Sequence, residues 1–364
     1  MLPMMELYRI WQERLTMLGL DVCRSQRENL VWLLAGLYWG RSVYLSYIAR
    51  KLPIRAQKLS LERRLRRFLD NPAVRVREWY HPTAVWLLRS AASGGAIHLV
   101  MDSTKVSFDY RLLMVGVAHH RRTLPLAWTW VQSPVGHSTA EKQRALLAYV
   151  RRLLPPGVIV TLVGDGEFGS SRLVRQVQQW GWRYALRQTG HTAFKLPLDW
   201  DWQRFLRAPL RPGMTVWCGT VLLNKSDMVL TGMVLHWARG EARPWFLATN
   251  VASSQEAIAL YRRRMWIEEM FGDLKQHGFD LEASQLRHFL RLSRLTLAVC
   301  WLYLWLVSLG QFVQHHQLSS LVDRTDRRDL SIFRLGWDYL ERCFALQDPF
   351  PFVTLPTFHL VSGD

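Results

Sequence analysis

Residues 261 to 275 read YRRRMWIEEMFGDLK, and the rest of the chain is interpreted outward from them. On a helix at about 100° per residue, Tyr261, Arg264, Glu268 and Lys275 fall within an arc of roughly 60°. This polar stripe presents a carboxylate flanked by two cations and a phenol, which suits a site for a divalent metal and phosphate oxygens. The alternative is a surface helix with ordinary charge pairs. A broader apolar stripe beside it would bury the helix and consists of Trp266, Ile267, Met270, Phe271 and Leu274.

Length and composition indicate a folded and strongly basic protein. The 364 residues are enough for two or three domains, and a hydrophobic content of 49% excludes a disordered chain. The net charge of +18 comes from 47 basic and 29 acidic residues. Such an excess predicts an anionic partner, for which nucleic acid is the first candidate and an anionic membrane surface the second.

Cysteine usage and hydropathy favour a cytoplasmic protein. The four cysteines are widely scattered and form no CxxC pair, so neither a zinc site nor a disulfide framework is indicated. The first residues, MLPMMELYRIWQERL, carry charges where a signal peptide needs an apolar run. The apolar segment from Leu295 to Gly310 is shorter than the roughly 18 to 20 residues of a membrane span. It is interpreted as a buried core helix, with a membrane span as the alternative.

Residues 1–92 are predicted to be helical, basic and DNA-binding. Helices broken near Gly40 and at Pro53 are followed by an arginine-rich segment that ends at Pro72. Two helices joined by a short turn, the second rich in Arg, suit a helix-turn-helix laid on a DNA backbone. A generic basic helical bundle is an equal alternative. The sequence AASGG, at 91–95, has the composition of a linker.

The hydrophobic pattern changes after this linker and predicts an α/β domain over 95–315. Three strands come first, AIHLVMDSTKV from Ala96, YRLLMVGVAHH from Tyr110 and LPLAWTWVQSP from Leu124. A helix over 139–154, capped by Ser138 or Thr139, leads to the buried strand VIVTLVGD and then to a further helix. This is the element order of a ribonuclease-H-like catalytic core.

Residues 182–252 interrupt that order. Four segments in this range have the β-branched and aromatic content of strands, which is more β-structure than the core needs. They are interpreted as a β-rich insertion ahead of one helix that begins at Ser253 or Ser254 and continues through 261–275. Residues 316–364 form a C-terminal tail, for which dimerisation or DNA contact is a possible role.

Three carboxylates stand at informative places in this arrangement. Asp102 ends the first strand, Asp165 ends the fourth, and Glu268 lies on the polar stripe of the later helix. Because the first and fourth strands are neighbours in such a sheet, the three acids are expected to converge. Oxygen ligands without His or Cys suit Mg²⁺ or Mn²⁺. Two such ions, about 3.5 to 4 Å apart, serve phosphodiester transfer.

These motifs together resemble the DDE transposases of bacterial insertion sequences. The resemblance rests on MDSTKV, on GDGEFGS and on Tyr-x2-Arg-x3-Glu-x6-Lys at 261–275, the signature of a large subgroup, and it covers about 95–310. It implies a two-metal DDE transposase that performs cut-and-paste transposition in the bacterial cytoplasm. A homodimer would act on the terminal inverted repeats of its element and on target DNA.

The resemblance also implies roles for six residues. The three acids, Asp102, Asp165 and Glu268, would be the catalytic metal ligands for Mg²⁺ or Mn²⁺. The other three residues would contact phosphate or the DNA ends, and they are Tyr261, Arg264 and Lys275.

Two positions depart from the subgroup pattern. The second acid is often followed by Arg, but here Gly166 follows it. A Trp commonly follows the signature Arg, whereas Met265 stands there and Trp266 comes one place later, on the apolar side of the predicted helix. A base-stacking role for Trp266 is therefore not supported by the pattern.

Neighbouring acids compete for the same roles. Glu269 is rotated by about 100° from Glu268, off the polar stripe, so Glu268 is preferred. Asp109 and Glu167 flank the two strand-end sites and are candidates for supporting the ligands through hydrogen bonds.

Two other functions are compatible with the sequence. One is a metal-dependent nuclease of the same fold, which would cleave DNA without joining strands. The other is a non-catalytic DNA-binding regulator derived from a transposase, against which the presence of all three acids argues.

Overall fold

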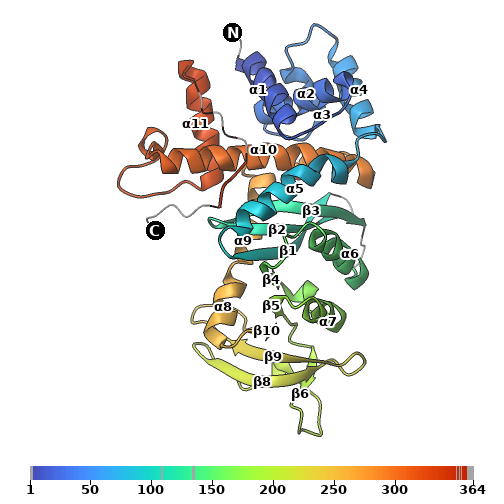
Figure 1. Cartoon of the computed structure of the whole chain (residues 1–364), viewed down its shortest axis with the longest axis vertical. Helices are drawn as coiled ribbons and strands as arrows, with labels where there is room; N and C mark the ends of the chain where they lie inside the picture. The colour runs from blue at the N-terminus through green and yellow to red at the C-terminus, as the bar shows by residue number, and fades with distance from the viewer. Residues whose placement is uncertain are drawn as a thin grey trace. The chain divides into compact units, whose positions relative to one another are not determined.

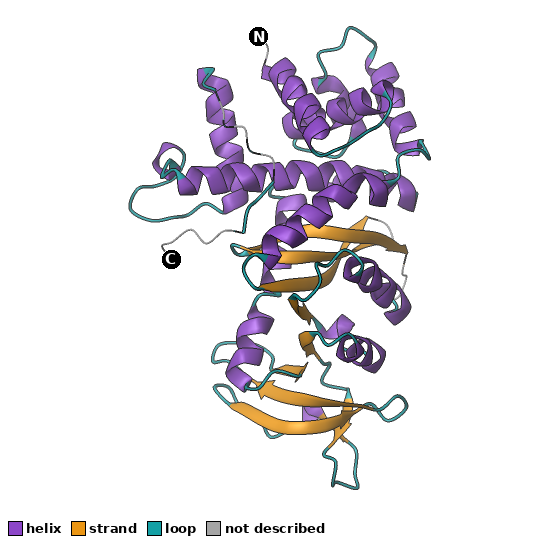
Figure 2. Ribbon diagram, in the orientation of Figure 1, coloured by secondary structure: helices purple, strands orange, loops and turns teal. Residues whose placement is uncertain are grey.

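A computed structural model describes residues 3–107, 110–132, 136–349, 351, 353 and 355–358. The chain divides into two compact units, each described here by itself. The helical unit comprises Met1–Ser90, Lys105–Tyr110 and Met270–Asp364, and the sheet unit comprises Ala91–Thr104 and Arg111–Glu269. Figure 2 shows that the strands gather in the sheet unit. The predicted division into 1–92, 95–315 and 316–364 stays a prediction.

The helical unit is built from amphipathic helices that pack against one long apolar helix. Its helices are α1 (Pro3–Met17), α2 (Arg24–Gly40), α3 (Leu45–Lys51), α4 (Lys58–Asp70), α5 (Val76–Ala92), α10 (Phe289–His315) and α11 (Ile332–Leu346). α3 and α4 are the two helices predicted around Pro53, and they pack against each other. α4 buries Leu61, Leu65 and Phe68 on one face and exposes Arg63, Arg66 and Arg67.

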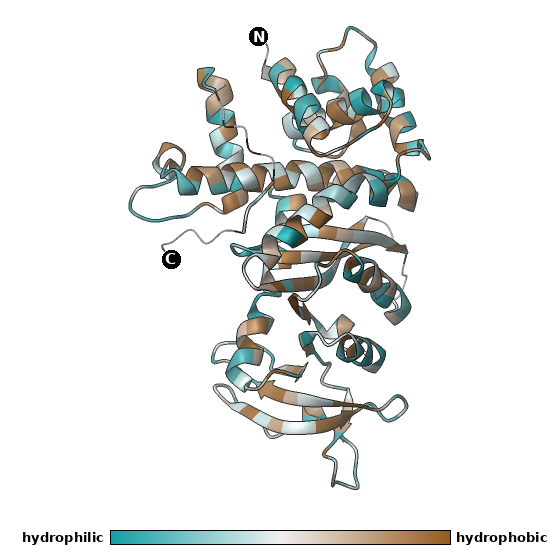
Figure 3. Ribbon diagram, viewed as in Figure 1, coloured by the Kyte–Doolittle hydropathy of each residue, from teal (hydrophilic) through white to brown (hydrophobic). Residues whose placement is uncertain are grey.

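α10 is the core of the helical unit (Figure 1). It has 27 residues, and it is the one helix of the described chain that is long and apolar enough to cross a membrane. The most apolar window of α10 is 89% buried. Apolar residues, brown in Figure 3, recur along its length. α2, α4 and α11 pack against α10 and bury it. This is the environment of a core helix, as the sequence predicted.

The sheet unit contains a mixed sheet of ten described strands in the order β3-β2-β1-β4-β5-β10-β9-β8-β6-β7. The first five are β1 (Ala96–Ser107), β2 (Tyr110–His119), β3 (Arg122–Gln132), β4 (Ile159–Gly164) and β5 (Arg183–Arg187). The other five are β6 (Ala193–Lys195), β7 (Gln203–Arg204), β8 (Thr215–Leu223), β9 (Val229–His236) and β10 (Trp245–Thr249). The helices α6 (Ala140–Arg151) and α7 (Ser171–Gln179) connect the strands that flank them in the chain. The coarse prediction of an α/β fold with N-terminal helices is confirmed, and the ribonuclease-H-like core stays a prediction.

The parallel strands set the positions of the predicted acids. β1 pairs in parallel with β4, as predicted, and β4 pairs in parallel with β5. The register places Met101 opposite Gly164, so Asp102 and Asp165 come directly after the last paired residues of the two strands. The prediction that Asp102 ends its strand is wrong, because β1 continues to Ser107, whereas Asp165 directly follows β4. Partners in register point to the same face of a sheet.

The β-rich region at 182–252 extends the same sheet. β10 pairs antiparallel with β5, and β9 and β8 continue the antiparallel order. Strands therefore lie in all four segments that were predicted from their β-branched and aromatic content. A register shift between Trp217 and Thr220 marks an irregularity in β8.

The single helix predicted from Ser253 through Lys275 is wrong. Two helices occupy this range, α8 (Ser254–Arg262) and α9 (Met265–Leu274). Ser253 caps α8 as expected, accepting a hydrogen bond from the backbone N–H of Glu256 at 3.1 Å. At the junction the backbone N–H of Arg264 donates to the Tyr261 carbonyl. Such a three-residue step turns the chain by more than 100° per residue, so one uniform wheel cannot describe the stretch.

Candidate active site

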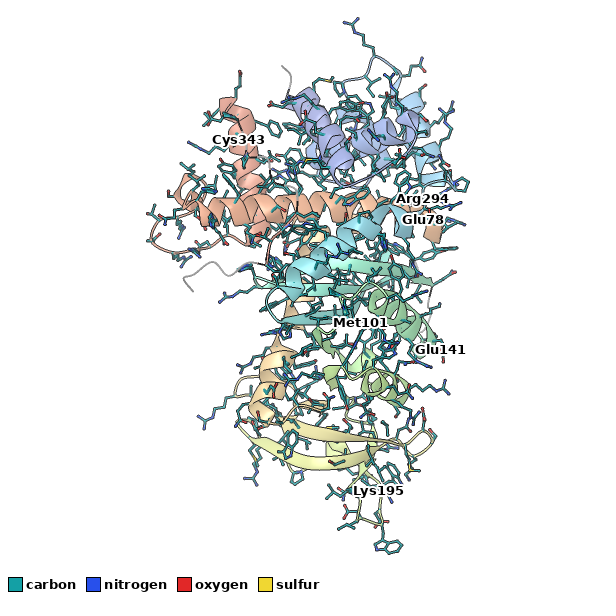
Figure 4. All side chains as sticks on the ribbon, viewed as in Figure 1. Glu78, Met101, Glu141, Lys195, Arg294 and Cys343 are labelled. Atoms are coloured by element: carbon teal, nitrogen blue, oxygen red, sulfur yellow. The ribbon has the colours of Figure 1, made fainter. Side chains whose placement is uncertain are left out.

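Asp102 lies within β1 and Asp165 directly follows β4, both just beyond the residues through which the two strands pair. Asp102 directly follows Met101, which is labelled in Figure 4, and it is 6% exposed. Its Oδ1 accepts a hydrogen bond from the backbone N–H of Ser103 at 2.7 Å. The half-buried Asp165 accepts from the backbone N–H of Glu167 at 2.9 Å, which caps a short 3-10 turn. Local hydrogen bonds therefore hold both carboxylates in place just beyond the paired residues of β1 and β4.

The surroundings of both acids disfavour their ionised form. Burial raises the pKa of Asp102 to about 7, and the neighbouring Asp165 adds to the increase. Burial also raises the pKa of Asp165. Arg264 acts in the opposite direction on both carboxyl groups. Arg187 also lowers the pKa of Asp165. Two desolvated carboxylates beside these cations are the electrostatic setting expected of a cation-binding or catalytic site.

Arg264 joins Asp102 to Glu268. Its Nη1 lies 3.3 Å from Oδ2 of Asp102 and 2.7 Å from Oε1 of Glu268. Burial alone would lower the pKa of Arg264, but Tyr261, Glu268 and Asp102 together raise it above its usual value. The guanidinium thus stays charged, and it ties the strand end to the first turn of α9.

Glu268 and Glu269 have different partners. The Glu268 side chain is 44% exposed and pairs with the buried Arg264. Glu269, 57% exposed, lies 3.3 Å from Nη1 of Arg122 on β3. The structure thus links Glu268, and not Glu269, to Asp102 through a shared cation. The assignment of Glu268 as a ligand stays a prediction.

Tyr261 is part of the interior. It is 2% exposed, its ring packs edge-on against Trp245 at 4.9 Å, and burial raises the pKa of its phenol. Arg264 and Asp165 both act on the phenol electrostatically. Tyr261 therefore lies with the acid group, and its predicted DNA contact stays a prediction.

Lys275 belongs to the helical unit. Its Nζ donates to the carbonyl oxygen of Lys105 at 2.7 Å and pairs with Glu282 at 2.7 Å. Five of the six residues predicted from the sequence lie in the sheet unit. The sixth, Lys275, makes these two contacts within the helical unit. Its predicted phosphate contact stays a prediction.

Glu167 ties three segments together beside the two aspartates. Its buried carboxylate accepts from Ser103 Oγ at 2.7 Å and from the backbone N–H of Ser138 at 2.7 Å. Arg111 Nη2 donates to the same Ser103 hydroxyl at 2.9 Å. Glu167 thus fixes the residue after Asp102 against the segment ahead of α6. Asp109, the other candidate for such support, lies outside the described residues.

Sequence reasoning missed the partners of Glu167. Ser138 was considered only as a helix cap, whereas Thr139 caps α6 and Ser138 binds Glu167. For Arg111 and Ser103, the sequence showed only that they lie close to the predicted hairpin and to Asp102. That proximity did not indicate the contacts they make. The contacts join residues far apart in the chain, so only the folded sheet reveals them.

The donor atoms suit a hard divalent cation in their chemistry. Asp102, Asp165 and Glu268 offer carboxylate oxygens only, which are ligands that Mg²⁺ and Mn²⁺ prefer. Among the residues that the structure describes, however, no three His, Cys, Asp or Glu side chains are grouped as a metal site. The residue types therefore fit a metal centre, and Arg264 stands where two of the candidate ligands meet.

Comparisons with known proteins point to one class. Residues 134–305, just under half of the chain, match the family model of the transposase DDE domain. The match includes Asp165 and Glu268 but begins after Asp102. It supports a transposase, an enzyme class that cleaves and joins DNA strands with divalent metal ions.

Curated proteins and solved structures add little to this. No curated protein matches the chain. A cryo-EM structure of the piggyBac transposase synaptic complex with hairpin DNA is similar at 10% identity and a TM-score of 0.42. The similarity covers 94% of this chain and 79% of that chain. We draw no conclusion from a similarity of this degree.

Proposed function

We propose that the protein is a metal-dependent DDE transposase that cleaves and joins DNA strands at the terminal inverted repeats of an insertion sequence. One observation carries the proposal. Asp102 and Asp165 follow the last paired residues of the neighbouring strands β1 and β4, and Arg264 links Asp102 to Glu268. The family match over 134–305 supports the same reading.

One or two Mg²⁺ or Mn²⁺ ions would be held by Asp102, Asp165 and Glu268. When bound, they would activate the attacking hydroxyl and stabilise the leaving oxygen. The chain's own residues prepare this site. Glu167 holds Ser103, and thereby the end of β1, in one position. Arg264 keeps a positive charge beside the acids and would attract a DNA phosphate to them. The predicted roles of Tyr261 and Lys275 are contacts to the DNA ends.

The helical residues 1–92 would bind DNA through the exposed arginines of α4. Arg63 and Arg67 lie on the face opposite the buried leucines, and neither forms an ion pair with a described residue. A net charge of +18 favours binding to the DNA backbone. Binding of both ends by a homodimer in the bacterial cytoplasm completes the proposal. The tail at 316–364 is assigned to dimerisation or DNA contact.

Cleavage and joining measured together test this function. Supercoiled plasmid is incubated with the protein and Mn²⁺, and a labelled duplex with free 3′-hydroxyls is added as the joining substrate. We expect nicked plasmid and label joined to plasmid, both abolished by EDTA. Nicking without joined label would contradict transposition and favour the nuclease. DNA binding without either product would favour the non-catalytic regulator.

A further inference from the structure

Two tyrosines and two cations share the exposed face of α3. Tyr44 and Tyr47 are 36% and 46% exposed, and Arg50 and Lys51 are also exposed. The spacing of three residues between Tyr44, Tyr47 and Arg50 places them on one face of a helix, and the opposite face is buried. Because exposed aromatic surface has no packing role inside the unit, this face is suited to a ligand.

The tyrosine and the arginine are already stacked. The Arg50 guanidinium carbon lies 4.4 Å from the centre of the Tyr47 ring, and the Tyr44 ring meets Tyr47 edge-on at 5.1 Å. A cavity of about 320 Å³ is lined by Gly40, Tyr47, Arg50 and Lys51, and we call it the Tyr47 pocket. No described carboxylate forms an ion pair with Arg50 or Lys51, so both positive charges remain available to an anion.

We infer that the Tyr47 pocket binds an unpaired nucleotide of a DNA strand. The two cations supply charge for a phosphate, and the stacked Tyr47 and Arg50 supply a planar surface for a base. Inside a duplex both faces of a base are covered by its neighbours, and an unpaired base exposes its faces for stacking. The inference rests on the proposed function, since it takes DNA as the ligand.

The neighbouring helix α4 has a different character. Its exposed face carries Arg63 and Arg67 but no aromatic residue, so it suits the sugar-phosphate backbone of a duplex. Duplex binding and unpaired-nucleotide binding are thus assigned to different helices. Substitutions on the two helices therefore separate the two kinds of binding.

Fluorescence anisotropy with the full chain in EDTA tests the inference. One labelled DNA is a blunt duplex, and the other is the same duplex with three unpaired nucleotides at its 3′ end. We expect the wild-type protein to prefer the overhang. Tyr47→Ala should weaken binding to the overhang duplex about tenfold, because one stacked base is lost, and leave blunt-duplex binding within about twofold.

Two matched variants serve as controls. Tyr47→Phe keeps the ring and should bind both duplexes as the wild type does. Arg63→Ala, on α4, should weaken binding to both duplexes by the same factor, because it removes a backbone contact. Tyr47 is largely exposed, so unchanged thermal unfolding of Tyr47→Ala would show that its effect is on binding.

Distinct results would overturn the inference. Equal weakening of both DNAs by Tyr47→Ala, or no weakening, would show that the pocket does not recognise unpaired nucleotides. Thymidine monophosphate that binds at micromolar concentration and removes the preference for the overhang would assign the pocket to free nucleotides instead. Binding of neither DNA by the wild type would instead contradict the proposed function.

Discussion

Replacing Glu268 by glutamine should lower the rate of Mn²⁺-dependent strand cleavage by more than about a hundredfold. Even residues that only support a metal ligand typically cost about 10- to 100-fold when removed, so loss of a ligand's charge should cost more. Glutamine keeps the size of the side chain, and its amide oxygen can still accept from Arg264. Because the Glu268 side chain is 44% exposed, the fold and DNA binding should persist. Plasmid nicking over time and a gel-shift assay measure the two properties.

Glu269→Gln is the matched control. Glu269 is the adjacent glutamate and is more exposed, and it pairs with Arg122 instead of Arg264. Its replacement removes the same charge from the same helix turn, and cleavage should stay within about twofold, as for most surface substitutions. Full cleavage by Glu268→Gln, or equal loss in both variants, would remove Glu268 from the site.

Gly310→Ala should lower the free energy of unfolding by about 3 kcal/mol or more, at the upper end of the range for overpacked cores. Gly310 of α10 and Gly336 of α11 lie where these helices cross. A Cβ on Gly310 would lie 1.7 Å from the carbonyl oxygen of Ile332, and a Cβ on Gly336 would lie 1.9 Å from that of Leu306. Backbone carbonyls cannot rotate away as side chains can, so the helices would have to separate. Urea unfolding monitored by circular dichroism measures the loss.

Gly40→Ala provides the comparison within the same unit. A Cβ on Gly40, the last residue of α2, would meet its nearest neighbour at 3.8 Å, an ordinary contact. Alanine is favoured over glycine in helices by up to about 1 kcal/mol, so this variant should be as stable as the wild type or more stable. Equal stability of Gly310→Ala and Gly40→Ala would contradict the close crossing of α10 and α11. Cys343, labelled in Figure 4, lies on α11 beyond this crossing.

Local patterns were enough to predict the strands and the two aspartates. Apolar runs leading into Asp102 and Asp165 indicated the two strands, although β1 continues past Asp102 to Ser107. The chain order predicted that β1 and β4 are neighbours. The β-branched and aromatic segments at 182–252 predicted β8, β9 and β10. These features depend on residues close together in sequence, which is why periodicity reveals them.

Other features depend on contacts between distant residues. A uniform wheel placed Arg264 on the polar stripe beside Glu268, but it could not show the contact with Asp102, which lies 162 residues earlier in the chain. Glu167 meets Ser103 and Ser138 only after the sheet has formed. The glycine crossing of α10 and α11 likewise needs both helices in place. Tertiary packing, and not local propensity, decides each of these.

The most direct test of the central claim is a calorimetric Mn²⁺ titration at pH 8 with a short duplex present, comparing the wild type with Asp102→Asn. At this pH Asp102 is ionised, above its raised pKa of about 7, and a bound cation would relieve its repulsion from Asp165. The account predicts saturable binding to the wild type and to Glu269→Gln, and its loss in Asp102→Asn. Equal binding to the wild type and Asp102→Asn would show that these carboxylates do not form the metal site.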